Sequence, residues 1–170
     1  MKKYLILAVF ISQISFSHTQ NKEALKQVLN TFMVSIVKSD SISFYGLFLE
    51  KSVNWVGIYK DKSQQKRWEN DPKSDTFFTD NYKSFFRSVK GGNCEEKFDN
   101  IEIIEDGNLA SINFDYTFWF KKKMLNWGKE FWHLIKIDGK WKITSVVFSM
   151  ELTKYFPQPT LKEPKKFDKL

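Results

Sequence analysis

The segment Leu109 to Phe120, LASINFDYTFWF, decides the fold of this 170-residue chain. Apolar and polar side chains alternate along it, which is typical of a β-strand with one buried face. The alternation predicts an inward row made of Ala110, Ile112, Phe114, Tyr116, Phe118 and Phe120. The other row, which ends at Trp119, should face outward. Tyr116 is then the one inward aromatic residue whose side chain ends in a polar group.

Strands are also predicted on both sides of this segment. The Asp106-Gly107 and Asp138-Gly139 pairs favour tight hairpins, because both positions accept positive φ. These turns divide the C-terminal half into strands at 98–105, 109–120, 130–137 and 141–150, with a basic loop at 121–129. The expected product is a meander of antiparallel strands.

The N-terminal half carries helical spacing instead. Apolar residues recur at helical intervals over 21–38, with Asn21 as a candidate N-cap, and again over 41–49 and 76–89. A strand is expected at 53–59, where β-branched and aromatic residues gather. Residues 60–75 are polar and aperiodic and are predicted to form a long loop.

Both ends of the sequence differ from the middle. Lys2 and Lys3, an apolar run over 5–11 and small residues at 15–19 follow the order of a cleaved signal peptide. The sequence therefore predicts three parts: a signal peptide at 1–19, one domain at 20–152 and a flexible Lys- and Pro-containing tail at 153–170. The mature protein should be periplasmic or secreted, with no stable membrane anchor.

Composition narrows the function classes. The formal charge of +7 is mild and spread along the chain, so we expect no nucleic-acid partner. Cys94 is the only cysteine, which excludes an intrachain disulfide. No cluster of His or Cys residues suggests a metal site, and no phosphate loop or dinucleotide glycine motif suggests a nucleotide. We therefore expect no cofactor.

The order of elements resembles the nuclear transport factor 2-like superfamily, in particular its SnoaL-like branch. The resemblance covers 22–152 and includes Asp40 after the first helix, Ala110 after the Gly107 turn and the closing hairpin DGKWKI at 138–143. It implies an α+β cone in which three N-terminal helices pack on a strongly bent antiparallel sheet. Members include ketosteroid isomerase, cyclases, dehydratases and noncatalytic binding proteins, so the fold alone does not choose a function.

A cone of this kind leaves a cavity, and inward aromatic residues should line it. The candidate pocket residues are Trp55, Tyr59, Phe86, Ile112, Phe114, Tyr116, Phe118, Phe131 and His133. Two of them could do chemistry: Tyr116 as a donor to a substrate oxyanion and His133 as a general acid or base. A structural role is the more common one for a single buried Tyr or His.

What the sequence does not reveal is a carboxylate base, because its acidic residues fall mainly in turns and at predicted outward positions. The leading hypothesis is therefore an exported, noncatalytic protein whose aromatic pocket binds a small apolar ligand. The alternative is an isomerase, dehydratase or cyclase that uses His133 and Tyr116. A third hypothesis is a protein-interaction module, with a homodimer formed through an outer face of Trp119, Trp132 and Leu134.

Overall fold

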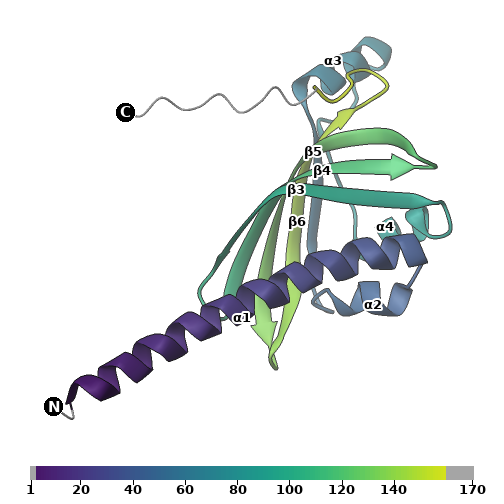
Figure 1. Ribbon diagram of the computed structural model, residues 1–170. Coiled ribbons are helices and arrows are strands. Elements are labelled where there is room, and N and C mark those ends of the chain that lie inside the picture. The colour runs from purple at the N-terminus through teal and green to yellow at the C-terminus, as the bar shows by residue number, and fades with distance from the viewer. Residues whose placement is uncertain (1–2, 160–170) are drawn as a thin grey trace, which may run out of the picture.

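A computed structural model describes the backbone of residues 3–159 and the side chains of residues 19–159 (Figure 1). The described chain is an α+β domain in which helices cover one face of a curved sheet. The helices are α1 (Lys3–Lys38), α2 (Ser41–Gly46), α3 (Asp61–Asn70) and α4 (Tyr82–Val89). The strands are β1 (Asn54–Tyr59), β2 (Phe77–Thr79), β3 (Cys94–Glu105), β4 (Leu109–Phe120), β5 (Lys123–Ile137) and β6 (Lys140–Leu152).

The six strands form one sheet in the order β2-β1-β6-β5-β4-β3. The predicted antiparallel meander of β3 to β6 is confirmed, and β4 has the bounds expected from its alternation. β1 then adds to β6 in parallel and β2 adds to β1 antiparallel. Register shifts interrupt all three hairpin pairs of the meander, and such bulges increase the bend and twist of long strands.

The core lies between the concave side of the sheet and the helices. α1 crosses the sheet, while α2 and α4 lie together near the C-terminal end of α1 (Figure 1). Aromatic rings fill much of the contact: Phe32 of α1 packs within 4.8 Å of Trp132, measured between ring centroids, and within 5.0 Å of Phe44 on α2. Asp40 caps α2 by accepting a 3.0 Å hydrogen bond from the Ser43 amide.

Three predicted connections have a different structure. Residues 60–75 contain α3, which carries no apolar stripe because its buried residues are polar: Ser63 donates to the Glu151 carboxylate and accepts from the Leu152 amide. The predicted helix over 76–89 begins only at Tyr82, since 77–79 pair with β1 as β2. The predicted loop at 121–129 is mostly β5, because Lys121 and Lys122 make the whole turn with positive φ.

The two ends of the described chain bear on the expected domain limits. α1 runs without a break through Asn21, so Asn21 is not an N-cap; its buried side chain instead donates to Glu105 and accepts from Lys136. At the other end, the Phe156 carbonyl accepts a hydrogen bond from the Trp127 indole, so ordered packing continues past residue 152. The side chains of 1–18 and all of 160–170 lie outside the described residues, and with them most of the predicted signal peptide and tail.

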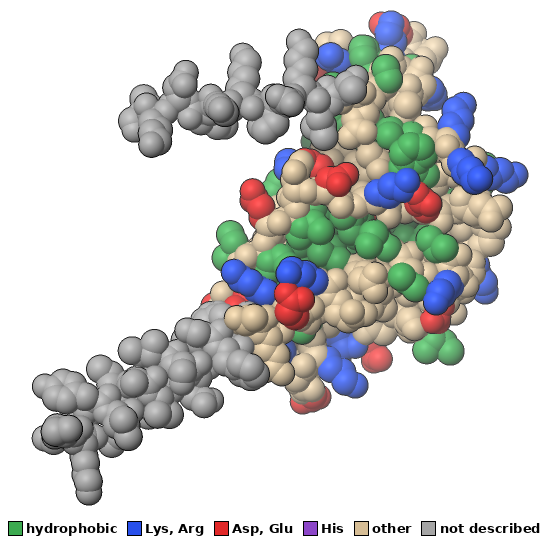
Figure 2. Space-filling model, viewed as in Figure 1, with side chains coloured by type: hydrophobic (Ala, Val, Ile, Leu, Met, Phe, Trp, Pro, Cys, Tyr) green, Lys and Arg blue, Asp and Glu red, His purple; other side chains and the backbone are tan. Residues whose placement is uncertain are grey.

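Among the described residues, no helix is both long enough and apolar enough to cross a membrane. One face of the molecule carries an apolar area bordered by charged side chains of both signs (Figure 2). The domain thus combines an aromatic interior with a mixed, charged surface.

Candidate functional site

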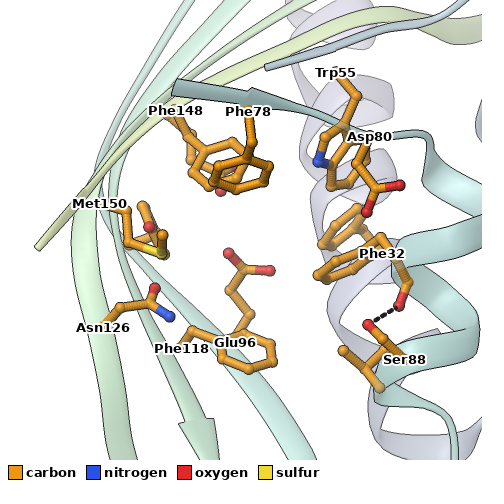
Figure 3. A pocket seen from close by; sticks show the side chains of 14 residues that line it. Phe32, Trp55, Phe78, Asp80, Ser88, Glu96, Phe118, Asn126, Phe148 and Met150 are labelled. Carbon is orange, nitrogen blue, oxygen red and sulfur yellow. Dashed lines mark hydrogen bonds between the residues drawn. The ribbon is translucent and has the colours of Figure 1, made fainter. Parts of the chain in front are cut away.

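The candidate site is a cavity of about 250 Å³ between the bent sheet and the helices α1 and α4 (Figure 3). Most of its wall is apolar, and the polar groups that enter it are few. The lining residues are Phe32, Trp55, Phe78, Asp80, Phe85, Ser88, Val89, Glu96, Tyr116, Phe118, Asn126, Glu130, Phe148 and Met150. An apolar cavity with a few convergent polar groups is the usual form of a small-molecule site.

Glu130 supplies the first of these polar groups. It lies opposite Phe114 of β4 and Phe148 of β6, which places its side chain on the concave face. The indole Nε1 of Trp132, two residues along the same face, donates a 2.7 Å hydrogen bond to its Oε2. Burial raises the pKa of the Glu130 carboxyl from 4.5 to about 7, although this hydrogen bond and one from Glu96 act in the opposite direction.

Glu96 supplies the second polar group and comes from β3, two strands away. The carboxyl groups of Glu96 and Glu130 are hydrogen-bonded to each other. Burial, followed by the charge of Glu130, raises the pKa of Glu96 well above its usual range. Near neutral pH the pair therefore holds a proton, with Glu96 as donor and Glu130 as acceptor.

Tyr116 of β4 lies between these two strands. Its side chain is only 3% exposed, and its hydroxyl has no hydrogen-bond partner among the described residues. Burial, together with the charges of Glu130 and Glu96, raises the pKa of this phenol well above 10.0, so the hydroxyl stays protonated. A buried polar group is normally paired, so this hydroxyl is available to bind a polar group of a molecule in the cavity.

The opening of the cavity carries more polar side chains. Asp80 and Ser88 are exposed and lie on the helix side, whereas Asn126 lies across from them on β5 (Figure 3). The Ser88 hydroxyl is already occupied, since it donates to the Phe85 carbonyl at 2.7 Å. Asp80 and Asn126 are thus the polar groups at the opening that face an entering molecule.

Within the described residues, no group of three His, Cys, Asp or Glu side chains converges in a way that could hold a metal ion. Cys94 is buried at the start of β3, and this burial raises the pKa of its thiol, which disfavours the thiolate needed for a nucleophile. The chemistry of the cavity thus depends on the two carboxyl groups and the phenol.

The nine predicted pocket residues fall into three groups. Trp55, Tyr116 and Phe118 line the cavity. A second group, Phe86, Ile112 and Phe114, is fully buried in the core behind the cavity wall. Tyr59 lies elsewhere, with the Arg67 guanidinium stacked 3.8 Å from its ring centroid.

The last two, Phe131 and His133, lie on the outer face of β5 and not in the cavity, so the inward position expected for Phe131 was wrong and the open orientation of His133 is outward. Trp132 and Leu134, expected on an outer dimer face, are fully buried in the core. Both faces of this segment are apolar, so its alternation does not identify the buried side. Pairing with β4 decides it, because Trp132 lies opposite the inward Ile112.

Trp119 has the outward orientation expected for it and is half-buried. Its indole donates a 2.9 Å hydrogen bond to the Thr117 hydroxyl, and the Lys97 ammonium lies 4.6 Å from its ring centroid. Its surroundings on this face are therefore polar.

The carboxyl pair was missed by sequence reasoning for two reasons. Glu96 precedes the predicted start of its strand at 98, and Glu130 shares the parity of Trp132, which was assigned outward. The one available signal was that Glu130 lies on the same row as Trp132, the largest apolar side chain of that stretch. An acidic residue at the start of a row of side chains that points into the core is the sequence feature that would indicate such a site.

Comparison with known proteins supports the architecture. No family model matches the sequence, and no curated protein matches it. Solved structures do match: a nuclear transport factor 2-like protein of unknown function from Shewanella baltica aligns with a TM-score of 0.52 at 16% identity, over 78% of this chain and 95% of the other. The chain has the nuclear transport factor 2-like fold.

Two further structures with this fold are similar. A candidate scytalone dehydratase from Novosphingobium aromaticivorans has a TM-score of 0.56 at 13% identity, over 81% of this chain and 89% of the other. LinA has a TM-score of 0.58 at 7% identity, over 81% of this chain and 90% of the other. At these identities the similarity concerns the fold, and the SnoaL-like branch stays a prediction.

Proposed function

We propose that the protein binds a small, largely apolar molecule in this cavity. The observation that carries the proposal is the Tyr116 hydroxyl, which is buried, unpaired and part of an aromatic wall. A buried hydroxyl without a partner costs about 1–3 kcal/mol, and a ligand with one polar group would remove this cost. The aromatic wall would supply the remaining affinity by burying apolar surface.

The volume of the cavity limits the ligand. A cavity of about 150 Å³ lined by apolar side chains holds a benzene molecule. The 250 Å³ found here therefore fits one ring with a short substituent, and not a large polycyclic molecule.

Binding of 4-(dimethylamino)benzonitrile, a neutral one-ring dye whose emission depends on the polarity around it, tests this proposal and is followed by fluorescence. Ser88→Trp places an indole at the opening of the cavity and should abolish the fluorescence increase. Arg87→Trp is the matched control, because Arg87 is the preceding exposed residue of α4 and does not line the cavity. Equal dye binding by both variants would contradict the proposal, as would a failure of small aromatic compounds to displace the dye.

A second candidate function is proton-transfer catalysis of the isomerase or dehydratase type. His133 cannot take part from the outer face, but the Glu96 and Glu130 pair offers the base that the sequence did not reveal. A carboxylate with a pKa of about 7 is a competent base near neutral pH, and Tyr116 could donate to a developing oxyanion.

Deuterium exchange distinguishes the two functions. If Glu130 abstracts protons next to a carbonyl, the protein in D₂O should exchange the α-protons of cyclohexanone faster than buffer does, as followed by NMR. Glu130→Gln should return the rate to that of buffer. Exchange that is unchanged by Glu130→Gln would contradict catalysis by this pair and leave ligand binding as the function.

We also propose that the mature protein is exported. The described contacts of Asn21 with Glu105 and Lys136 lie after the expected cleavage sites at Ser17 and Thr19, so cleavage would keep them. Mass spectrometry of C-terminally tagged protein recovered from the periplasm or medium should show loss of the first 17 to 19 residues. An intact N-terminus on cell-associated protein would contradict export.

A further inference from the structure

The cavity contains acidic groups with no basic side chain to balance them. Its titratable lining residues are Asp80, Glu96, Tyr116 and Glu130, and within the described part of the chain no Lys, Arg or His lines it. Glu96 and Glu130 are both buried, and each is held in place, Glu130 by Trp132 and Glu96 by Glu130. Burying a carboxylate without a cationic partner is costly.

The walls around this pair favour a positive charge. Trp55 lies 5.0 Å from Phe85 and 6.4 Å from Phe148 between ring centroids, and Tyr116 lies 6.1 Å from Phe148. The rings of Phe78 and Phe148 lie above the Glu96 carboxyl group in the cavity (Figure 3). Aromatic faces attract cations, and the attraction reaches about 2 kcal/mol where water is excluded.

Tyr116 provides an independent indication of a ligand. Its hydroxyl is buried and unpaired, and it lies on the strand between those that carry the two glutamates. A phenol oxygen can accept a hydrogen bond as well as donate one. An ammonium group has three donors, which matches two carboxyl oxygens and one phenol oxygen.

We propose that the polar group of the ligand is a protonated amine, held between Tyr116 and the Glu96 and Glu130 carboxyl groups inside the aromatic wall. This inference rests on the proposed binding function and names the class of ligand: a primary ammonium on a single aromatic or aliphatic ring with a short linker. The cation supplies the charge partner that the protein lacks in this cavity.

A matched pair of ligands tests the inference. 2-Phenylethylamine and 2-phenylethanol share one skeleton and differ in the amine. In calorimetric titrations of the full chain at pH 8, the amine should bind at least about tenfold more tightly than the alcohol, a difference of about 1.4 kcal/mol. Glu130→Gln should remove this preference, because it removes the negative charge that favours the amine over the alcohol.

The pH dependence gives a second measurement on the unmodified protein. The amine stays protonated between pH 5 and 8, while the carboxyl pair loses its proton as the pH rises. Affinity for the amine should therefore rise over this range, whereas affinity for the alcohol should stay level. Asp80→Asn is the control for the charge at the opening and should keep most of the preference, because Asp80 is exposed to solvent.

The outcomes separate the two proposals. Equal affinity for amine and alcohol would overturn the amine inference and leave the binding cavity in place. Binding of neither ligand, together with no binding of the one-ring dye, would overturn both. If Glu130→Gln does not fold by circular dichroism, Glu96→Gln and the pH series on the unmodified protein decide the question in the same way.

Discussion

The indole of Trp132 and the carboxylate of Glu130 form a buried hydrogen bond of 2.7 Å on the concave face of β5. The two residues are neighbours on one face of a strand. The indole is buried in the apolar core, next to the buried carboxyl group that lines the cavity. This contact fixes the orientation of Glu130 and supplies a donor to its ionised form.

Trp132→Phe tests the strength of this contact. The variant keeps an aromatic ring in the core but removes the donor, and hydrogen bonds to charged groups contribute about 1.5–3 kcal/mol. We expect the free energy of unfolding to fall by about 2 kcal/mol at pH 8 and by less at pH 5, where Glu130 is protonated. Urea denaturation at the two pH values measures the difference.

Trp141→Phe is the matched control for that variant. Trp141 is also buried, but its indole N–H has no hydrogen-bond partner in the part of the chain that the structure describes. Its replacement should therefore cost packing alone and show no pH dependence. An equal pH dependence in both variants would mean that the contact between Trp132 and Glu130 does not stabilise the charged carboxylate.

The carboxyl pair makes stability depend on pH. Folding raises the pKa of Glu130 from 4.5 to about 7, and that of Glu96 in the same direction. Between these values the folded state binds more protons than the unfolded state, so stability is greatest near pH 4.5 and falls as the pH rises through 7. For Glu130 the raised pKa corresponds to a loss of about 3 kcal/mol. Thermal unfolding across this range measures it.

Glu130→Gln isolates the contribution of that residue. The amide cannot ionise, so the variant should lose less stability between pH 5 and 8 than the unmodified protein. Glu96→Gln together with Glu130→Gln should remove nearly all of the decrease. A decrease of the same size in the double variant would assign it to other groups.

Tyr116→Phe separates ligand binding from stability. The hydroxyl has no hydrogen-bond partner in the described structure of residues 19–159, so its removal breaks no hydrogen bond there and relieves the cost of burying it. We expect the ligand-free variant to be as stable as the unmodified protein or more stable by about 1 kcal/mol, and to bind 2-phenylethylamine less tightly. A large loss of stability would show that the hydroxyl does have a structural partner.

The sequence predicted the sheet better than the surroundings of the cavity. The alternation over Leu109–Phe120 gave the bounds of β4 and the inward orientation of Ala110 to Tyr116, because the opposite face is polar from Ser111 to Thr117. Phe120, which was expected to point inward, is 37% exposed beyond the register shift between Phe118 and Trp119. It did not orient β5, where both rows are apolar and only pairing with β4 sets the facing. Alternation of apolar and polar residues identifies the buried face of a strand only where one face lies in the core and the other in solvent.

The polar parts of the site depend on long-range pairing. Glu96 and Glu130 lie 34 positions apart and meet only because β4 runs between their strands. Similarly, the hydrogen bond from Ser63 to Glu151 holds α3 against β6. No periodicity of apolar residues within α3 indicates this contact. Neither relationship can be predicted from spacing along a single segment.

Gly128 tests the close packing behind Tyr116. It lies opposite Tyr116 on β4, and a Cβ at this position would collide with the Ser149 backbone of β6 and touch the Tyr116 ring. Because that backbone cannot move without breaking strand pairing, Gly128→Ala should destabilise the protein by on the order of 3 kcal/mol in urea. Gly46→Ala is the control. A Cβ at position 46 meets nothing within 4 Å, so the stability of this variant should equal or slightly exceed that of the unmodified protein.

The outer face of β5 is the remaining candidate for self-association. Phe131 is 42% exposed there and lies between Asn113 of β4 and Val147 of β6 in the sheet. An exposed ring at the centre of a sheet face, with Leu109 and Ile137 also exposed, is typical of an interface. We therefore propose a homodimer through this face, with Phe131 in the position first expected for Trp132.

Sedimentation velocity at tens of micromolar, a range that detects weak dimers, tests this proposal. The unmodified protein should sediment as a dimer, and Phe131→Glu should shift it to the monomer, because a carboxylate buried at an interface costs several kcal/mol. Ile42→Glu is the matched control, since Ile42 is 86% exposed on α2, and it should stay dimeric. A monomeric unmodified protein would contradict the dimer, and an effect of Ile42→Glu alone would place the interface on the helices.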